Sequence, residues 1–320
     1  MEGFVMKLNQ LINQYIGYRK ALGEKFKTNE AVLKAFCRDM GTETPLKSVT
    51  EEMIHHFLYR KAGTITTGWF CKHTALLGLY RYAVSRNYVT KIPLPRNLPK
   101  RPQGIVPYIY TQPELKLIFD GALKYQKNKS HNDPCIVRMA LILTYITGLR
   151  VHETLSITLN DIDMNNMVIT IRQSKFYKSR LVPFNEEVRK VLDIFLRWRK
   201  VHQQSVAPES HLLINNHGKP LCADSLRDIF HRILKNAGIK RQDGSAFLPR
   251  LHDLRHTFAV TRLISWYRQG KDVQQLLPIL SVYLGHKHLS HTSVYLSMTN
   301  DLLKEANIRF ESFVKKQSNS

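Results

Sequence analysis

The feature that most constrains this chain is a run of prolines about one third of the way along it. Prolines stand at positions 93, 95, 99, 102 and 107. Proline has no backbone N–H and a fixed φ, so a segment with this many prolines cannot continue a helix. The sequence therefore predicts an extended linker over residues 93–110 that separates two domains.

The part before the linker carries apolar residues at helical spacing throughout. Residues 4–22 predict a first helix. A second covers residues 30–40 and ends at Gly41, and Ser48 with Glu51 forms a capping box that opens a third, through residue 60. Residues 66–88 predict a long fourth helix rich in aromatic side chains. Because no strand pattern occurs, we expect residues 1–92 to form a small all-helical domain.

The part after the linker predicts a mainly helical domain with a small antiparallel β-sheet, over residues 111–316. Thr111 and Glu114 form a capping box, and Asp133 with a following proline opens a buried helix that ends at Gly148. Residues 164–184 predict short strands around turns, and residues 211–221 a small hairpin. Helices are predicted over 185–201, 223–236 and 251–269, with another before Gly285.

Positive charge is spread over both parts of the chain. Residues 1–100 hold 16 Lys and Arg against 7 Asp and Glu, and residues 101–320 hold 32 against 18. The formal net charge is +23. An excess of this kind, in place of a basic tail on a neutral body, favours a protein that encloses a polyanion such as DNA. A basic protein without a nucleic-acid partner is the alternative on charge alone.

Several other classes of protein are disfavoured. The four cysteines are scattered and none form a Cys-x-x-Cys pair, which indicates reduced thiols and no zinc knuckle or disulfide framework. The most apolar segment, residues 139–149, is far short of the roughly 20 residues that span a bilayer. The first ten residues lack the apolar region of a signal peptide. We therefore expect a cytoplasmic protein with no membrane partner.

Three short strings hold candidate catalytic residues. The first, TGLRVHE, places Arg150 just after a helix-ending glycine, where backbone geometry holds it at the helix end. The second, LHDLRHTFA, places His252 and Arg255 three residues apart on one face of a helix, so that both can address one ligand. Taken alone, a solvated surface arginine and a helix-capping histidine explain these residues as well.

The third string, LGHKHLSHTSVYLS, places His286 nine residues before Tyr295. Three histidines in it raise the alternative of a zinc site. No cysteine or carboxylate completes that set at ligand spacing, so we expect no metal and no cofactor. Tyr295 lies on an apolar stripe and on its own fits a buried core residue.

In this order, the three strings with a lysine between the first and second resemble the tyrosine recombinase (phage integrase) family. The resemblance covers residues 105–310, and the helical front part with its linker is similar to the family's core-binding domain. It implies a site-specific DNA recombinase that cleaves and rejoins DNA through a 3′-phosphotyrosyl intermediate. It also implies a partner of double-stranded DNA with a specific recombination site, a homotetramer on synapsed DNA, and a role in integration or excision.

The resemblance also assigns roles to individual residues. Arg150 and Arg255 hold the scissile phosphate, and Tyr295 attacks it. His252 and His286 bond the phosphate oxygens, and His252 is also able to take the tyrosine proton. Lys175 protonates the leaving 5′-oxygen, while Glu153 supports an active-site side chain without touching DNA.

Two departures from the family pattern bear on these assignments. The lysine string reads SKFYKSR where the family often has GKGxKxR, so Lys178 stays open as an alternative to Lys175. Residues 266–283 lengthen the segment between the second and third strings, and with VYLSMTNDLL this form resembles recombinases of transposons and related mobile elements.

Two other functions remain open from the sequence. One is a DNA-binding partner whose chemistry is supplied by a sister recombinase. The other is a type IB topoisomerase, which shares the chemistry but acts without sequence preference.

Overall fold

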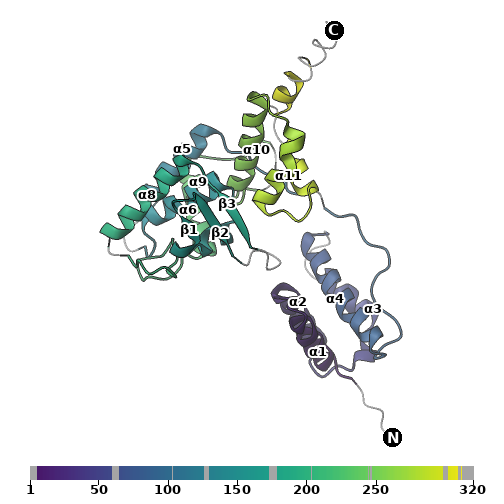
Figure 1. The fold of residues 1–320 in the computed structure, drawn as a ribbon. Coiled ribbons are helices and arrows are strands. Elements are labelled where there is room, and N and C mark those ends of the chain that lie inside the picture. The colour runs from purple at the N-terminus through teal and green to yellow at the C-terminus, as the bar shows by residue number, and fades with distance from the viewer. Residues whose placement is uncertain are drawn as a thin grey trace. The chain divides into compact units, whose positions relative to one another are not determined.

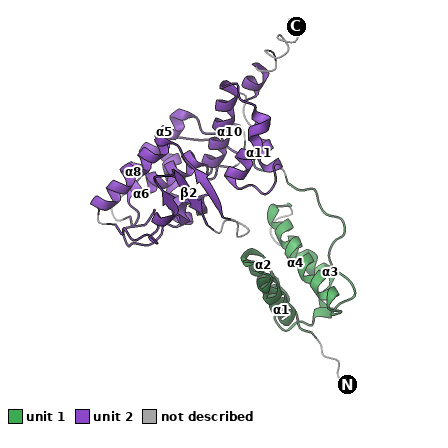
Figure 2. Ribbon diagram, viewed as in Figure 1, with its two compact units in different colours: residues 1–104 green, residues 105–320 purple. Residues whose placement is uncertain are grey.

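The computed structural model describes residues 6–59, 65–102, 104–125, 130–172, 179–202, 204–243, 245, 247–297, 302–308 and 311. The chain divides into two compact units, residues 1–104 and 105–320 (Figure 2). Most of the described residues are helical, and the strands all lie in the second unit (Figure 1). No helix of the described segments is long and apolar enough to cross a membrane.

The first unit is a helical bundle in which α4 packs against the other helices. Its helices are α1 (Leu8–Ala21), α2 (Lys27–Met40), α3 (Glu51–Tyr59) and α4 (Thr67–Ser85), with a 3-10 turn at η1 (Leu46–Ser48). As the sequence predicted, α2 ends at Gly41, whose φ of 94° is a conformation that favours glycine. The predicted capping box of the third helix was wrong. Ser48 lies in η1, and the Thr50 hydroxyl instead accepts from the Met53 N–H at the start of α3.

The second unit surrounds one large apolar core with helices and a sheet. Its first helices are α5 (Gln112–Lys124), α6 (Pro134–Thr147) and α7 (Val151–Ser156), followed by a 3-10 turn, η2 (Leu159–Asp161). Thr111 and Glu114 form the predicted capping box of α5, and Asp133 caps α6. α6 is buried along most of its length and packs against α5 and α10 (Asp253–Arg268), so it forms the centre of this unit.

The sheet is small and antiparallel, with the order β1-β2-β3. Its strands are β1 (Ile162–Asp163), β2 (Val168–Ile171) and β3 (Arg180–Pro183). Ile169 of β2 pairs with Val182 of β3, and both side chains are fully buried. In this register Leu181 and Pro183 of β3 point away from the core. Arg180 is the first residue of the strand and contacts α11 (Val273–Leu284).

The remaining helices cover the core and add a second apolar cluster. They are α8 (Glu186–Val201), α9 (Ala223–Asn236), α10 (Asp253–Arg268), α11 (Val273–Leu284) and α12 (Ser290–Ser293), with a 3-10 turn, η3 (Val294–Ser297). α10, α11 and η3 share the second cluster, which contains Phe258, Leu277 and Tyr295. The predicted hairpin at residues 211–221 is reduced to isolated bridges, such as that between Ile214 and Pro220.

Candidate active site

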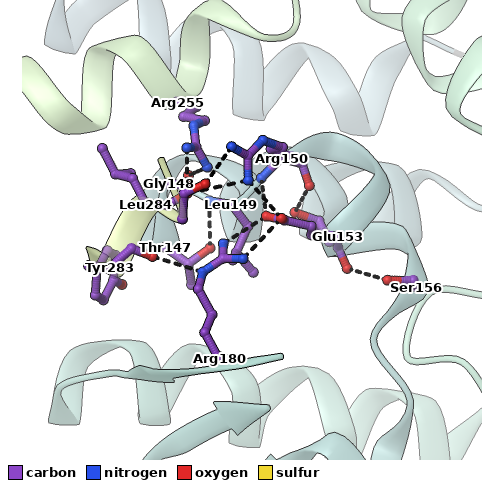
Figure 3. A network of polar contacts seen from close by, with 12 residues as sticks. Thr147, Gly148, Leu149, Arg150, Glu153, Ser156, Arg180, Arg255, Tyr283 and Leu284 are labelled. Carbon is purple, nitrogen blue, oxygen red and sulfur yellow. Dashed lines mark hydrogen bonds and ion pairs between the residues drawn. The ribbon is translucent and has the colours of Figure 1, made fainter. Parts of the chain in front are cut away.

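Two arginine side chains meet where α6 and α11 end. The last carbonyl groups of a helix lack a partner within it, so they are available to outside donors. Arg255 donates to the Gly148 carbonyl at 2.9 Å and to the Leu284 carbonyl at 2.6 Å. Arg150 donates to the same Leu284 carbonyl at 3.4 Å and to the Gly285 carbonyl at 2.8 Å. The two guanidinium groups are therefore neighbours, although their strings lie about a hundred residues apart (Figure 3).

Glycine is needed at both helix ends that hold these arginines. Gly148 and Gly285 have φ of 61° and 67°, in the left-handed region that side chains disfavour. A Cβ on Gly148 would also collide with the Phe258 ring, and one on Gly285 would lie 2.9 Å from the Arg180 guanidinium. These turns expose the carbonyl groups that orient both guanidinium groups.

Burial changes the two arginines to different degrees. Arg255 exposes 1% of its surface, while the Arg150 side chain stays 28% exposed. Burial, and then the positive charge of Arg150, lower the pKa of Arg255 to about 10. Arg255 therefore stays charged at neutral pH. A guanidinium has five N–H groups, so bonds to carbonyl oxygens leave further donors for a ligand with several oxygens.

Glu153 binds Arg150 and a third arginine, Arg180. Its carboxylate accepts from Arg150 Nη1 at 2.9 Å and from the two Nη atoms of Arg180 at 3.0 and 2.8 Å (Figure 3). Arg180 Nε donates to the Tyr283 carbonyl at 3.0 Å. The ion pair links β3 to the first turn of α7, and the hydrogen bond to Tyr283 links β3 to the end of α11. Burial opposes ionisation of Glu153, but the bonds from Arg180 and from the Arg150 N–H outweigh it and lower the pKa of Glu153 to about 2.

Replacing Glu153 by Gln is expected to destabilise the second unit in a pH-dependent way. A carboxyl pKa of about 2 in the fold against an ordinary 4.5 corresponds to about 3 kcal/mol of stability at neutral pH. That contribution is fully present above pH 4.5 and is lost as the pH falls towards 2. The difference in unfolding free energy between the wild type and Glu153→Gln should therefore be largest at pH 7 and shrink below pH 4.5.

Denaturant unfolding of both proteins at pH 7, 5 and 3 measures this difference. A Trp69→Phe background leaves Trp198 and Trp266 to report the second unit. Glu187→Gln is the matched control, because Glu187 is exposed on α8 and its change should stay within about 0.5 kcal/mol. An equal loss at all three pH values would contradict an ionised Glu153 held by arginines.

Tyr295 is placed in η3 with its ring in the second apolar cluster. It exposes 2% of its surface and shares that cluster with Phe258 and Leu284. Burial raises the pKa of the Tyr295 phenol, and the charge of Arg255 and a hydrogen bond from it oppose this rise only in part. The phenol is therefore protonated at neutral pH and has to lose its proton in order to act as a nucleophile.

Two histidines lie near Tyr295, and one of them contacts its hydroxyl. His256 Nδ1 lies 2.9 Å from the hydroxyl oxygen, and the His286 ring centroid lies 6.2 Å from that of Tyr295. His286 Nδ1 is held by the Thr292 hydroxyl at 2.7 Å. Burial, and then the charges of Arg255 and Arg150, lower the pKa of His286 to about 3, so its imidazole is neutral at physiological pH.

His252 stands at the N-cap position of α10 and is the most exposed member of the site. Its ring packs edge to face on His256, with centroids 4.8 Å apart. Surrounding protein atoms, and then the positive charges of Arg255 and Arg250, lower the pKa of His252 to about 4. Its exposed position at the rim suits a group that bonds an incoming substrate.

The structure thus brings together six of the seven predicted site residues: Arg150, Glu153, His252, Arg255, His286 and Tyr295. The seventh, Lys175, and its alternative, Lys178, lie outside the described residues. The sequence interpretation missed two residues of the site, Arg180 and His256. Both residues lie in strings named above: Arg180 ends SKFYKSR, and His256 lies in LHDLRHTFA. For His256 the available signal was its spacing of four residues from His252, which puts both histidines on one face of the helix.

The zinc alternative for the three histidines of the third string finds no support in their arrangement. Within the described ranges, no three His, Cys, Asp or Glu side chains gather as metal ligands would. His286 instead bonds Thr292, and His288 packs edge to face on His291.

Comparison with known proteins places this geometry in a family. The model of the phage integrase family matches residues 113–301. The chain is 32% identical over 307 residues to a putative integrase/recombinase, y4rB, of Sinorhizobium fredii, covering 94% of this chain and 96% of the relative. It is 29% identical over 236 residues to tyrosine recombinase XerC of Bacillus subtilis, covering 73% of this chain and 71% of the relative.

Solved structures share the fold at lower identity. A lambda integrase tetramer bound to a Holliday junction aligns with a TM-score of 0.68 at 19% identity, over 94% of this chain and 79% of that one. The Tn1549 transposon integrase in complex with transposon right end DNA aligns with a TM-score of 0.67 at 18% identity, over 97% and 100%. The predicted fold class, a helical domain followed by a mixed domain with a small antiparallel sheet, is confirmed. The chain therefore belongs to the phage integrase family and is a tyrosine recombinase, an enzyme of site-specific DNA recombination.

Proposed function

We propose that this recombinase cuts one DNA strand at a time with Tyr295 and rejoins it through a 3′-phosphotyrosyl intermediate. The observation that carries the proposal is the meeting of Arg150 and Arg255 at the Leu284 carbonyl. Two permanent positive charges side by side are suited to a phosphodiester, whose two non-bridging oxygens take bidentate bonds from guanidinium groups. The Tyr295 hydroxyl lies within reach of one of them, Arg255.

Each remaining residue supplies one requirement of phosphoryl transfer without a metal. His252 and His286 add neutral donors for the non-bridging oxygens, as the family resemblance implies. Lys175 gives a proton to the departing 5′-oxygen. Glu153 keeps Arg150 in place and does not touch the DNA. Charge on the phosphate is thus met by guanidinium groups, which take the part that metal ions play in other phosphoryl-transfer sites.

We further propose that both parts of the chain bind double-stranded DNA at a specific site. Residues 1–92 are assigned as the core-binding domain, 93–110 as the linker and 111–316 as the catalytic domain. The excess of Lys and Arg in both parts supports this division of work, because each part can neutralise phosphates and release counterions. The related lambda integrase and Tn1549 integrase were solved on DNA.

The active assembly we propose is a homotetramer on two synapsed sites. Sister recombinases are a further class of partner that we propose. Residues 302–308 are helical after the catalytic tyrosine. Leu302 is fully buried in the second apolar cluster of its own unit, while Leu303 and Ile308 are exposed. The exposed residues of this helix are the ones we assign to contact with a neighbouring protomer. Phe310 and Phe313, further along the sequence, lie outside the described residues.

The biological role we propose is integration or excision of a mobile element. Its support is the lengthened segment between the second and third strings, which the structure resolves into the end of α10 and the whole of α11. A search of the DNA that flanks the gene for inverted repeats provides the substrates with which to examine this role.

A cleavage assay on nicked duplexes from that flanking DNA tests the proposed function. A nick just beyond the cleavage position releases a short 5′-hydroxyl strand, so that the covalent intermediate accumulates. We expect a covalent protein–DNA adduct on a subset of the duplexes and none on scrambled ones. A protein that binds these duplexes but forms no adduct is a DNA-binding partner only. Relaxation of any supercoiled plasmid, without sequence preference, would identify a topoisomerase instead.

Cleavage is expected to persist in excess EDTA, because Arg150 and Arg255 supply the positive charge at the phosphate. The adduct yield on the nicked duplex should change by less than about twofold, which is small against the several kcal/mol that a catalytic metal contributes. Loss of the adduct on chelation, with recovery on adding Zn²⁺ or Mg²⁺, would overturn this part of the mechanism.

A further inference from the structure

The Tyr295 hydroxyl contacts a histidine to which neither the family pattern nor the sequence interpretation assigned a role. His256 lies one turn after His252 on α10, and its Nδ1 atom is 2.9 Å from the Tyr295 hydroxyl oxygen. The two rings are 5.5 Å apart between centroids. Tyr295 exposes only 2% of its surface, so a protein group in contact with its hydroxyl is well placed to receive its proton.

The surroundings of His256 favour the tautomer that accepts this proton. Its Nε2 atom lies 4.0 Å from Oδ1 of Asp253, which is fully buried. Arg250 holds that carboxylate through its backbone N–H at 2.8 Å and its Nη2 at 2.9 Å. Although 4.0 Å is too long for a hydrogen bond, a carboxylate at that distance favours a proton on Nε2. Nδ1 then keeps its lone pair towards Tyr295, so the phenol donates and the imidazole accepts.

The arrangement repeats the logic of a nucleophile, a base and an orienting carboxylate. Tyr295 is the nucleophile, His256 is the base, and Asp253 is the carboxylate nearest to the far nitrogen of that base. Phenol oxygen and imidazole nitrogen lie within hydrogen-bond reach of one another, which is the first geometric requirement of general-base catalysis.

We propose that His256 is the catalytic base that takes the Tyr295 proton during strand cleavage, a role that rests on the proposed function. As the Tyr295 oxygen forms its bond to phosphorus, the hydroxyl proton moves to His256 Nδ1. The bond from phosphorus to the 5′-oxygen breaks, and that oxygen takes a proton from the general acid. In religation the 5′-hydroxyl attacks the phosphotyrosine and gives its proton back to the deprotonated general acid, the bond from phosphorus to the Tyr295 oxygen breaks, and His256 returns its proton to that oxygen.

His252, the alternative base, is less suitably placed for this step. It stands at the N-cap position, just before α10, and is exposed, with its ring against His256. A role on the phosphate oxygens fits that place at the rim. Burial, and then the nearby positive groups, lower the pKa of His256 to about 3, which leaves the imidazole neutral at physiological pH but does not strengthen it as a base. The inference therefore rests on the contact of 2.9 Å with the Tyr295 hydroxyl.

Two substitutions separate a proton acceptor from a residue that only positions Tyr295. In His256→Asn the amide oxygen can accept the hydrogen bond from the Tyr295 hydroxyl, but it cannot hold the proton. In His256→Ala both functions are lost. If His256 is the base, both variants should cleave a nicked duplex about 10²–10⁴-fold more slowly than the wild type in single-turnover experiments. DNA affinity and the melting temperature of His256→Asn should stay close to those of the wild type.

The pH dependence of the cleavage rate also separates the two roles, because loss of a residue that only positions Tyr295 should leave this dependence unchanged. Without the base, hydroxide has to remove the proton, so the rate of His256→Asn should rise by up to about tenfold per pH unit between 7 and 9 relative to the wild type. The ratio of the two rates cancels the titration of other groups in both proteins. The charged and titratable groups that face His256 are Arg250, His252, Asp253, Arg255, His286 and Tyr295.

The outcomes distinguish this inference from the proposed function. If the wild type forms no adduct on any duplex, the recombinase mechanism itself fails. If the wild type cleaves and His256→Asn cleaves within about threefold of it at every pH, His256 only positions the tyrosine and the inference is overturned. A slow His256→Asn protein that shows the same pH profile as the wild type would overturn it as well.

Discussion

Tyr295→Phe is expected to bind its DNA site normally and to form no covalent adduct. The substitution removes one oxygen atom, which is the nucleophile, and leaves the ring in its apolar cluster with Phe258 and Leu284. The lost hydrogen bond to His256 is expected to change stability by only about 1 kcal/mol, so the fold and the DNA-binding surface should persist. Denaturing gels of nicked duplexes should therefore show no adduct, while gel-shift affinity matches the wild type.

Tyr283→Phe is the matched control for this experiment. Tyr283 also lies beside the arginine pair, but it contributes its backbone carbonyl, which the substitution keeps. The control should cleave at a rate close to that of the wild type. If the adduct persisted in Tyr295→Phe and disappeared in Tyr283→Phe, the nucleophile would be Tyr283, and the assignment of Tyr295 would be wrong.

Lys175→Ala is expected to slow cleavage of ordinary DNA by about 10²–10⁴-fold, the range of a general acid. The only task assigned to Lys175 is to protonate the departing 5′-oxygen. That need disappears when a sulfur atom replaces the bridging 5′-oxygen, because a thiolate leaves without a proton. Single-turnover cleavage of the 5′-phosphorothiolate strand should therefore be nearly as fast in Lys175→Ala as in the wild type.

Lys178→Ala separates the two lysines of the strand-turn segment. If Lys178 only contacts a phosphate, its loss should cause a smaller defect that the sulfur substitution does not rescue. Rescue that follows Lys178 instead would show that the assignment is displaced by three residues. The segment reads SKFYKSR and lacks the glycines of the family's GKGxKxR pattern, so that pattern does not decide which lysine is the general acid. The experiment on the two lysines decides it.

Much of the fold was predictable because local signals decide where helices begin and end. Asp133 and Gly148 bracket α6 as predicted, and Gly148 adopts the left-handed conformation that the sequence position required. The third helix shows the limit of such signals. Ser48 and Glu51 have the spacing of a capping box, but Leu46 is buried and holds this segment as a 3-10 turn, so Thr50 becomes the capping residue.

The site was predictable as a set of residues but not as a set of contacts. Arg150, Arg255 and Tyr295 were recognisable because they stand in short strings whose order is specific. Which histidine meets the tyrosine depends on the packing of η3 against α10, a contact between segments some forty residues apart. His252 and His256 differ by one helical turn, and only that packing distinguishes them.

Arg180 was missed for a related reason. Its sequence neighbours mark it as the first residue of a strand, and a strand terminus on the surface is an ordinary place for arginine. Its partner Glu153 comes from α7, and the carbonyl that it contacts belongs to Tyr283 of α11. The contacts of Arg180 therefore form only when β3, α7 and α11 have packed together.

Peptide mapping of the trapped adduct tests the central claim most directly. Wild-type protein is incubated with a cleavable nicked duplex, the DNA is trimmed with nuclease, and the protein is digested and analysed by mass spectrometry. The account predicts a single modified peptide, with a 3′-linked nucleotide on Tyr295. A nucleotide on another side chain, such as His286 or Tyr283, would contradict the account even if cleavage itself is efficient.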